Sequence, residues 1–449
     1  MGKLFGTDGI RGVANREVTA EMAYRMGCAA TAYFGQHTDK QPVILIGRDT
    51  RISGQMLEAA LAAGICSAGG KAILLGVIPT PAVAYLARLL GAQAGVVISA
   101  SHNVFSDNGI KFFGGDGYKL LDAVEAELEE LLLGGLDKLD KPTGAQVGTI
   151  EHRPDLAEEY IKYALSTVQG DFNGMKIVVD CANGSSYAVT PEVLRRLGAE
   201  VIVLHNEPNG ININDNCGSV HLESLQAAVK EYGADMGIAH DGDADRCLTV
   251  DEKGEVVDGD HMMAICALKL QREGKLVDNT LVATVMSNIG LHQAMKAAGI
   301  RIEVTPVGDR YVLENMRANG YVLGGEQSGH IIFGDVATTG DGLVTALQIV
   351  QAVRMSGTTL SELSACMTTF PQLLVNVRVK TKAGWETNEA IRAAIREGEA
   401  ALGDAGRILV RPSGTEPLIR VMAEGPTAEA LDEIVGKIAD VVRKEQGQD

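Results

Sequence analysis

The chain has 449 residues, of which 46% are hydrophobic and 22% charged, as expected for a folded protein with several domains rather than a disordered one. The formal net charge of −18 disfavours general binding to nucleic acid or to an anionic membrane surface. A small anion could still bind in a local basic pocket.

The sequence carries no signal for export or membrane insertion. No run of about 18 apolar residues occurs, and the start, MGKLFGTDGIRG, lacks the apolar core of a signal peptide. The seven cysteines are scattered and never form a CxxC pair, which predicts reduced thiols rather than a disulfide frame or a zinc site. We therefore expect a cytoplasmic protein that binds neither nucleic acid nor a membrane.

The first motif is a glycine-bracketed loop, LFGTDGIRGVAN at residues 4–15, which carries Asp8 and Arg11. Taken alone, this loop predicts little. It gains meaning only from the motifs that follow.

Three later segments share one pattern: a β-branched apolar run, a turn, a helix rich in Ala and Leu, a glycine and a second apolar run. They are residues 43–77, 176–205 and 281–307. Each pattern predicts a βαβ unit, and such units build parallel sheets covered by helices. Because the units recur at domain-sized intervals, we expect three related α/β domains rather than a solenoid.

The C-terminal segment follows a different pattern. An alternating strand at 370–382 precedes a helix near 386–402, two strands within 407–425 and an amphipathic terminal helix. This order predicts a small α+β domain. The predicted domain boundaries are therefore 1–150, 151–253, 254–370 and 371–449.

The run GVVISASHN, residues 95–103, presents a hydroxyl at the end of a predicted buried strand. Ser101 is either a satisfied polar group, for example a helix N-cap, or a nucleophile. This motif alone does not decide between the two.

Three carboxylates alternate with small residues in AHDGDADRCLTV, residues 239–250. Asp241, Asp243 and Asp245 can point to one side of an extended backbone, where they would repel one another unless a cation lies among them. An EF-hand is excluded, because Arg246 stands where the calcium loop needs glycine and a strand follows where a helix is needed. The motif suits Mg²⁺ engaged with a phosphate, with an acidic surface turn as the alternative.

A glycine-rich turn follows in YVLGGEQSGHIIFGD, residues 321–335. Glycines let the backbone approach a ligand closely, while Glu326 and Ser328 offer groups suited to sugar hydroxyls or an amine, and His330 follows them. The alternative is a solvated surface turn.

The last motif, RPSGTEPLIR at 411–420, combines guanidinium groups, hydroxyls and exposed backbone N–H groups between two strands. This is the chemistry of a phosphate cradle, although an Arg-Ser-Gly turn is also common in hairpins. The residues concerned are Arg411, Ser413, Gly414, Thr415 and Arg420.

Together, and in this order, the five motifs resemble the α-D-phosphohexomutase superfamily, and within it the bacterial phosphoglucosamine mutases. The resemblance covers essentially the whole chain. It implies a heart-shaped fold of four domains, three of them related α/β domains and the last a smaller α+β domain.

The resemblance also implies an activity, the interconversion of glucosamine 6-phosphate and glucosamine 1-phosphate through a phosphoserine enzyme and a glucosamine 1,6-bisphosphate intermediate. The product would feed the synthesis of UDP-N-acetylglucosamine and cell-wall precursors. Phosphoglucomutase or phosphomannomutase activity, and a non-catalytic sugar-phosphate binding protein, are the alternatives.

Residue roles follow from the same resemblance. Ser101 matches the phosphoserine, whose phosphate joins Asp241, Asp243 and Asp245 in holding one Mg²⁺. Arg246 closes the same motif and is expected beside the phosphoserine.

The other motifs match the rest of a catalytic cleft. Arg11 and Lys111 match positively charged positions, and Glu326 and Ser328 match contacts to sugar hydroxyls. The loop 411–420 matches the one that grips the phosphate not being transferred. Both Lys111 and His330 are candidates for exchanging a proton with a hydroxyl, and the sequence does not choose between them.

The resemblance implies sugar phosphates as small-molecule partners and glucosamine or glucose 1,6-bisphosphate as an activator. It leaves open a homodimer and a priming kinase. One departure concerns Val104, because the superfamily usually has proline after SHN. Proline fixes φ, so its loss puts the stiffness of the Ser101 loop in question.

Overall fold

The computed structural model describes residues 4–6, 8–136, 141–413 and 416–447. It divides into two compact units. The first comprises Met1–Met286 and Gly299–Cys366, and the second comprises Ser287–Ala298 and Met367–Asp449.

The first sheet has six strands in the order β1-β5-β4-β2-β3-β6. Strands β4, β2, β3 and β6 run parallel, whereas β5 pairs antiparallel with β4 and β1 pairs antiparallel with β5. Its elements are β1 (Ile10–Val13), α1 (Ala20–Gly35), β2 (Val43–Arg48), α2 (Ile52–Ser67), β3 (Lys71–Val77), α3 (Thr80–Leu90), β4 (Ala94–Ile98), β5 (Asp107–Gly114), α4 (Asp122–Glu130) and β6 (Thr149–His152).

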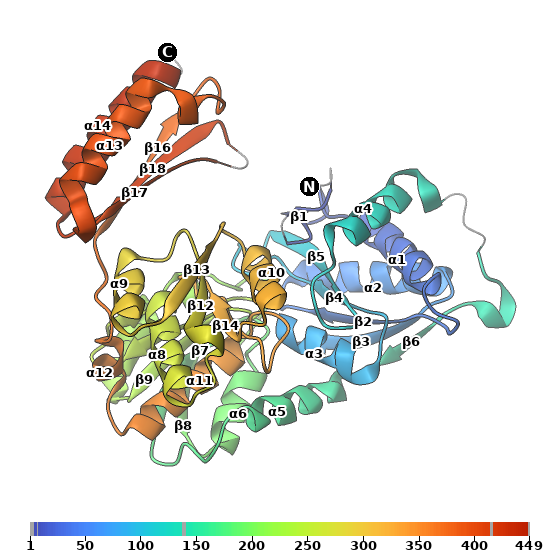
Figure 1. Cartoon of the computed structure of the whole chain (residues 1–449). Helices are drawn as coiled ribbons and strands as arrows, with labels where there is room; N and C mark the ends of the chain where they lie inside the picture. The colour runs from blue at the N-terminus through green and yellow to red at the C-terminus, as the bar shows by residue number, and fades with distance from the viewer. Residues whose placement is uncertain (1–3, 7, 137–140, 414–415, 448–449) are drawn as a thin grey trace. The chain divides into compact units, whose positions relative to one another are not determined.

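Successive residues of the central strands point to opposite faces of this sheet. Ile46 and Val96 pack into the core shared with α1 and α2. Gly47 and Gly95 face the other way, where the side chain of Val83 from α3 lies against them. Helices therefore cover both faces, as Figure 1 shows.

The second sheet has the order β11-β10-β9-β7-β8, in which β8, β7 and β9 run parallel and β10 and β11 antiparallel. Val178 and Ala239 of this sheet pack against Leu225 and Val229 of α7. Its elements are α5 (Ala157–Ser166), β7 (Lys176–Asp180), α6 (Val189–Arg196), β8 (Glu200–Leu204), α7 (Glu223–Tyr232), β9 (Met236–His240), β10 (Cys247–Asp251) and β11 (Val256–Val257).

The third sheet has the order β13-β12-β14-β15, with only β15 antiparallel to its neighbour. Its segment includes α8 (Gly259–Arg272), β12 (Thr280–Thr284), α9 (Ile289–Ala297), β13 (Arg301–Thr305), α10 (Asp309–Asn319), β14 (Leu323–Gly325), β15 (Ile331–Phe333), α11 (Gly342–Ser356) and α12 (Leu360–Ser364). Helix α9 belongs to the second compact unit.

One arrangement recurs in all three sheets. A strand parallel to the centre of the sheet ends in a short loop, and the chain returns as an antiparallel strand: β4 to β5, β9 to β10 and β14 to β15. The three loops are residues 99–106, 241–246 and 326–330. They carry three of the five sequence motifs, and they leave the carboxyl ends of parallel strands, where α/β sheets bind ligands.

The C-terminal segment forms an antiparallel sheet of order β16-β18-β17 with two helices. Ile391 of one helix and Val435 and Ile438 of the other join Val421 of the sheet in one core. The elements are β16 (Gln372–Arg378), α13 (Glu389–Leu402), β17 (Arg407–Pro412), β18 (Leu418–Glu424) and α14 (Ala428–Gln446).

The predicted fold class is confirmed, with three α/β sheets and an α+β segment at the C-terminus. The expectation of parallel sheets needs correction, because each α/β sheet carries an antiparallel strand at the loop of interest. The proposed boundary at residue 150 falls inside β6, which pairs with β3.

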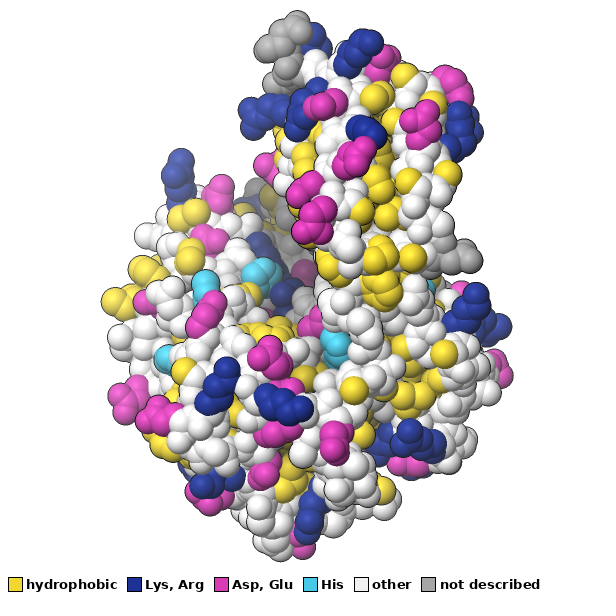
Figure 2. Space-filling view, turned by 90° about the vertical axis from the view of Figure 1, so that its left-hand side faces the viewer, with side chains coloured by type: hydrophobic (Ala, Val, Ile, Leu, Met, Phe, Trp, Pro, Cys, Tyr) yellow, Lys and Arg dark blue, Asp and Glu magenta, His cyan; other side chains and the backbone are white. Residues whose placement is uncertain are grey.

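None of the described helices is both long enough and apolar enough to span a membrane. On the face drawn in Figure 2, acidic and basic side chains are interspersed without a broad basic patch among the described residues.

Candidate active site

Ser101 lies three residues beyond the end of β4, and it is buried at 1% exposure. Its hydroxyl donates a hydrogen bond of 2.5 Å to Oδ2 of Asp241. The backbone of Ser101 has φ 52°, which a residue other than glycine rarely adopts. The loops after β4 and β9 therefore bring the predicted nucleophile and the first aspartate of the acidic trio into contact.

The acidic trio is buried in the loop 241–246. Oxygen atoms from Asp241, Asp243 and Asp245 all lie within 4.8 Å of one another. Burial and the charges of the other two aspartates raise the pKa of Asp241. One oxygen each of Asp243 and Asp245 is buried without a hydrogen-bond partner among the described residues. Crowded carboxylates with unsatisfied oxygens fit a divalent cation, so the trio is a candidate metal site.

A close approach of backbones sets the shape of this site. A Cβ atom on Gly242 would lie 2.6 Å from the carbonyl oxygen of Ser101. Only glycine lets the two loops come so near. On its other side, the loop accepts a hydrogen bond at the Ala244 carbonyl from the N–H of Gly342, the first residue of α11.

Lys111, on β5, projects into the same site. Its Nζ is 2.7 Å from Oδ2 of Asp243, 3.1 Å from Oδ2 of Asp8 and 3.7 Å from Oδ2 of Asp245. Burial alone would lower the pKa of Lys111, but Asp243 and Asp8 raise it overall. Lys111 is therefore a permanent cation. The same ion pair holds the pKa of Asp243 below its usual value although burial acts to raise it.

Two arginines complete the positive charge. Arg11 forms an ion pair with Asp8, and its Nε is buried without a partner among the described residues. The backbone N–H of Arg246 donates to Oδ1 of Asp241 at 3.3 Å, and its Nε is 4.0 Å from Asp245. Both guanidinium groups thus lie beside the acidic trio with donor capacity left over.

The glycine-rich loop 326–330 joins β14 to β15 as a tight turn. The N–H of Gly329 donates to the carbonyl of Glu326, and Cys247, at the start of β10, donates its N–H to the carbonyl of Gly329. The turn is thereby attached to the strand that follows the acidic loop. The carboxylate of Glu326 accepts from the N–H of Gly308 at 3.0 Å, and Oγ of Ser328 is buried without a partner among the described residues.

His330 closes the turn with 3% of its side chain exposed. Neither ring nitrogen has a hydrogen-bond partner among the described residues. Its Nε2 is 3.5 Å from Oδ2 of Asp309 and 4.0 Å from Oδ2 of Asp245. The imidazole of His330 therefore lies close to the acidic trio, with both ring nitrogens available for a further hydrogen bond.

Sequence reasoning missed two charged groups of this site, Lys119 and Asp309. Lys119 forms ion pairs with both Asp8 and Asp309, and so connects the N-terminal loop to the start of α10. Asp8 was visible in the N-terminal motif, but its partners were not. Neither Lys119 nor Asp309 lies in a recognisable motif, because their pairing depends on segments 190 residues apart.

The C-terminal unit assembles its own cluster. Arg411 of β17 and Arg420 of β18 stand opposite each other in register. Burial and the neighbouring charge of Arg420 lower the pKa of Arg411. Ser413 is buried, and its backbone carbonyl accepts from Nζ of Lys382 at 2.8 Å. Two adjacent guanidinium groups have the chemistry to bind an anion, so this cluster is a candidate anion site. The remaining predicted residues of this loop, Gly414 and Thr415, lie outside the described residues.

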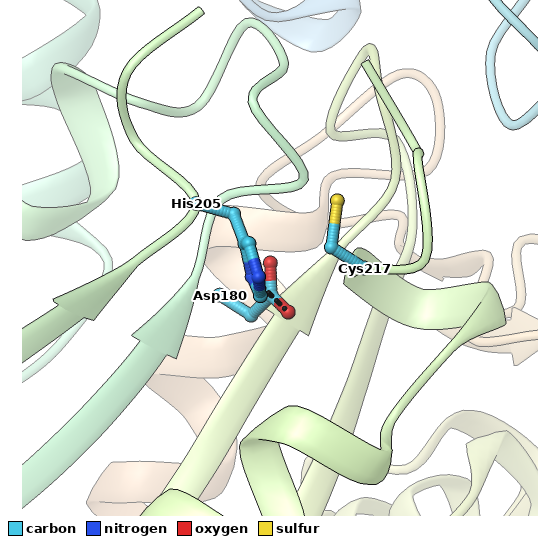
Figure 3. A group of neighbouring side chains, drawn as sticks. All are labelled: Asp180, His205 and Cys217. Atoms are coloured by element: carbon cyan, nitrogen blue, oxygen red, sulfur yellow. Dashed lines mark hydrogen bonds and ion pairs between the residues drawn. The ribbon is translucent and has the colours of Figure 1, made fainter. Parts of the chain in front are cut away.

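A second group with metal-ligating side chains, Asp180, His205 and Cys217, lies in the first unit (Figure 3). Asp180 already accepts three hydrogen bonds, from the N–H groups of Ala182 and Gly218 and from Nδ1 of His205. Burial raises the pKa of Cys217 to about 12. A satisfied carboxylate and a protonated thiol indicate a structural junction between loops.

Four family profiles match the chain. They describe the phosphoglucomutase/phosphomannomutase α/β/α domains I, II and III, at residues 2–136, 158–254 and 258–370, and the C-terminal domain at 374–441. Together they span most of the sequence.

Solved structures share the fold. A phosphoglucomutase/phosphomannomutase family protein from Burkholderia thailandensis superposes with a TM-score of 0.81 at 22% identity, covering 99% of this chain and 98% of that one. An Aspergillus fumigatus N-acetylphosphoglucosamine mutase, solved in complex with GlcNAc-6P and magnesium, superposes with a TM-score of 0.72 at 19% identity, covering 98% and 95%.

Curated relatives are much closer in sequence. The phosphoglucosamine mutases of Symbiobacterium thermophilum and Heliobacterium modesticaldum are each 55% identical to this chain, and that of Brevibacillus brevis is 53% identical. Each alignment covers 99% of this chain and 100% of the relative. The chain therefore belongs to the phosphoglucosamine mutase family of the α-D-phosphohexomutase superfamily.

Proposed function

We propose that the chain interconverts glucosamine 6-phosphate and glucosamine 1-phosphate, with Ser101 carrying the phosphoryl group. The contact of the Ser101 hydroxyl with Asp241, inside a site that holds three carboxylates and Lys111, carries this proposal. In the first step, the phosphoryl group passes from Ser101 to O1 of the sugar, and a bisphosphate forms. After the bisphosphate reverses its orientation, its 6-phosphate passes to Ser101.

The residues present fit a Mg²⁺ ion held by Asp241, Asp243 and Asp245, with the phosphate of Ser101 as a further ligand. Such an ion would neutralise charge on the transferring group. Lys111, Arg11 and Arg246 act on the same group. Phosphoryl transfer needs positioning and charge stabilisation above all, and these three cations, of which Lys111 is buried, would supply both.

A hydroxyl that accepts the phosphoryl group must lose its proton. Lys111 is unsuited to take it, because its pairing with Asp243 and Asp8 raises its pKa and keeps it protonated. His330 has two ring nitrogens without partners among the described residues, and it faces Asp309 and Asp245. We therefore assign the proton exchange to His330.

Substrate contacts are assigned from the remaining motifs. Glu326 and Ser328 would contact the sugar, and the paired Arg411 and Arg420, with Ser413, would bind the phosphate that is not transferred. A single cradle would serve both orientations of the bisphosphate. Gly414 and Thr415 are proposed for the same cradle.

Glucosamine or glucose 1,6-bisphosphate would act as activator by phosphorylating Ser101. We also keep as proposals a priming kinase, a homodimer, and the domain boundaries 1–150, 151–253, 254–370 and 371–449.

The experiment that tests the function is turnover of Ser101→Ala on glucosamine 6-phosphate, with intact mass of the wild type. We expect loss of turnover, and one added phosphoryl group on Ser101 in the wild type. Wild-type turnover by Ser101→Ala would refute the covalent mechanism. A preference for mannose or glucose phosphates over glucosamine phosphates would overturn the substrate assignment.

A further inference from the structure

The backbone of the Ser101 loop is held in an unfavourable conformation. Ser101 has φ 52°, and a side chain other than that of glycine keeps such a φ only where its surroundings enforce it. The N–H of Ser101 donates to Oγ of Ser99 at 2.9 Å. Its carbonyl group is held by two hydrogen-bond donors, which fix the backbone in this conformation.

Arg51 is the first of these donors. Its guanidinium is fully buried, and one nitrogen donates to the carbonyl oxygens of Ser101 at 3.0 Å and Asn103 at 2.9 Å. The other terminal nitrogen donates to the carbonyls of Val104 and Asp107. Nε of Arg51 is held by Asp49 at 2.8 Å, so the guanidinium plane has one orientation.

Asn214 is the second donor, and it comes from the loop after β8. Its Nδ2 donates to the same two carbonyls, of Ser101 at 2.9 Å and Asn103 at 3.0 Å. Two buried donors thus share both acceptors: Arg51 from the loop after β2 and Asn214 from the loop after β8. An sp² oxygen with two donors has little freedom to rotate away.

The loop that presents Asn214 is itself fixed. The N–H of Asn214 donates to the carbonyl of Ala182 at 2.9 Å. On either side of it along the chain, His205 and Gly218 donate to the buried carboxylate of Asp180, and Figure 3 draws the pair of His205 and Asp180. The hydrogen bond to Asp180 raises the pKa of His205. A preorganised donor of this kind loses little conformational freedom when it binds its acceptors.

We propose that Arg51 and Asn214 are positioning residues for the transfer step, acting through the carbonyls of Ser101 and Asn103. They keep Oγ of Ser101 at its place beside Asp241, where the phosphoryl group must lie in line with the attacking hydroxyl. This inference rests on the proposed role of Ser101. It also accounts for Val104, because the exit of the loop is restrained by Arg51 without the proline of the superfamily pattern.

The test compares glycine variants at two asparagines of one loop. Asn214 and Asn216 both have positive φ, so Asn214→Gly and Asn216→Gly keep the backbone preference and remove only a side chain. Asn216 contacts Asp215 and is the matched control. We expect kcat of Asn214→Gly to fall on the order of 10- to 100-fold with KM nearly unchanged. Asn216→Gly should keep wild-type kcat and KM.

Arg51→Lys is the second variant, since one ammonium cannot reach all four carbonyls. We expect the same loss of kcat, with the Ser101 site still phosphorylated by glucose 1,6-bisphosphate as seen by intact mass. Wild-type kcat in Asn214→Gly, or a change confined to KM, would overturn the inference. If Asn214→Gly does not fold, Arg51→Lys provides the test. Wild-type kcat in Arg51→Lys, or a change confined to KM, would then overturn the inference. Turnover by Ser101→Ala would instead overturn the proposed function, so the two failures are distinguishable.

Discussion

The hydroxyl of Ser101 donates to the carboxylate of Asp241 at 2.5 Å, although the two residues are 140 positions apart in the chain. The contact exists because each residue follows a parallel strand of its own sheet, and the two loops meet where those strands end. Gly242 permits the approach, since a side chain there would meet the Ser101 carbonyl.

Asp243→Asn should reduce Mg²⁺-dependent turnover on the order of 100-fold or more while the fold persists. The amide has nearly the shape of the carboxylate, but it lacks the charge that pairs with Lys111 and that a cation would require. Turnover measured against Mg²⁺ concentration, with circular dichroism for the fold, checks this. Asp215→Asn, on an exposed loop residue, is the control. Equal turnover in the two variants would contradict the assignment.

Gly242→Ala should lower both kcat and the melting temperature. A Cβ atom there would lie 2.6 Å from the Ser101 carbonyl oxygen and 2.9 Å from Nδ2 of Asn214, so one of the two loops must move. Gly436 in α14 is a contrasting site, because nothing lies within 4 Å of a Cβ there. Gly436→Ala should stabilise the protein by about 0.5–1 kcal/mol. Steady-state kinetics and thermal melts of both variants provide the comparison.

Lys119→Met should destabilise the protein by up to about 3–5 kcal/mol, because it leaves the carboxylates of Asp8 and Asp309 together without their shared cation. The control is Lys162→Met. Lys162 forms an exposed pair with Glu159, and its loss should leave the free energy of unfolding nearly unchanged. Chemical denaturation measures both. Similar stability of the two variants would show that the largely buried ion pairs around Lys119 do not stabilise the fold.

Asp341 should make the stability depend on pH. Burial raises its pKa from 3.8 to about 6, although Tyr160 and the N–H of Val344 donate to it. The folded state therefore keeps this proton to a higher pH than the unfolded state does. The protonated carboxyl group therefore contributes about 2–3 kcal/mol to the free energy of unfolding. This contribution is complete below pH 3.8 and is lost as the pH rises to about 6. Asp341→Asn should remove this part of the slope in unfolding curves measured between pH 4 and about 7. If the free energy of unfolding of Asp341→Asn kept the wild-type dependence on pH, Asp341 would not be its source.

Val104→Pro should leave kcat within about twofold of the wild type, since the loop is already restrained through the carbonyls that Arg51 binds. A large gain in kcat would instead show that the wild-type loop is mobile. Kinetics of this variant in the wild-type and Arg51→Lys backgrounds separates the two outcomes. Partial recovery of an Arg51→Lys defect would indicate that proline and arginine restrain the same loop.

Local patterns predicted the elements well because they depend on neighbouring residues. The three βαβ segments were visible because apolar runs of β-branched residues and helices ending at glycine have distinct periods. Each is found in the structure as two parallel strands joined by a helix. The antiparallel strand after each motif loop was not predicted, because a short apolar run says nothing about the direction of its partner.

The chemical groups and the order in which the chain offers them could be read from the sequence: Ser101 after one strand, three aspartates after another, and Glu326 to His330 in a glycine-rich turn. The packed sheets were needed to show that β4, β9 and β14 end in equivalent loops, and that Lys119, Arg51 and Asn214 reach carboxylates and carbonyls far from them in sequence. The physical reason is the separation along the chain over which each interaction acts. Periodicity and turn chemistry act over a few residues, whereas ion pairs and hydrogen bonds between loops form only after the sheets have packed.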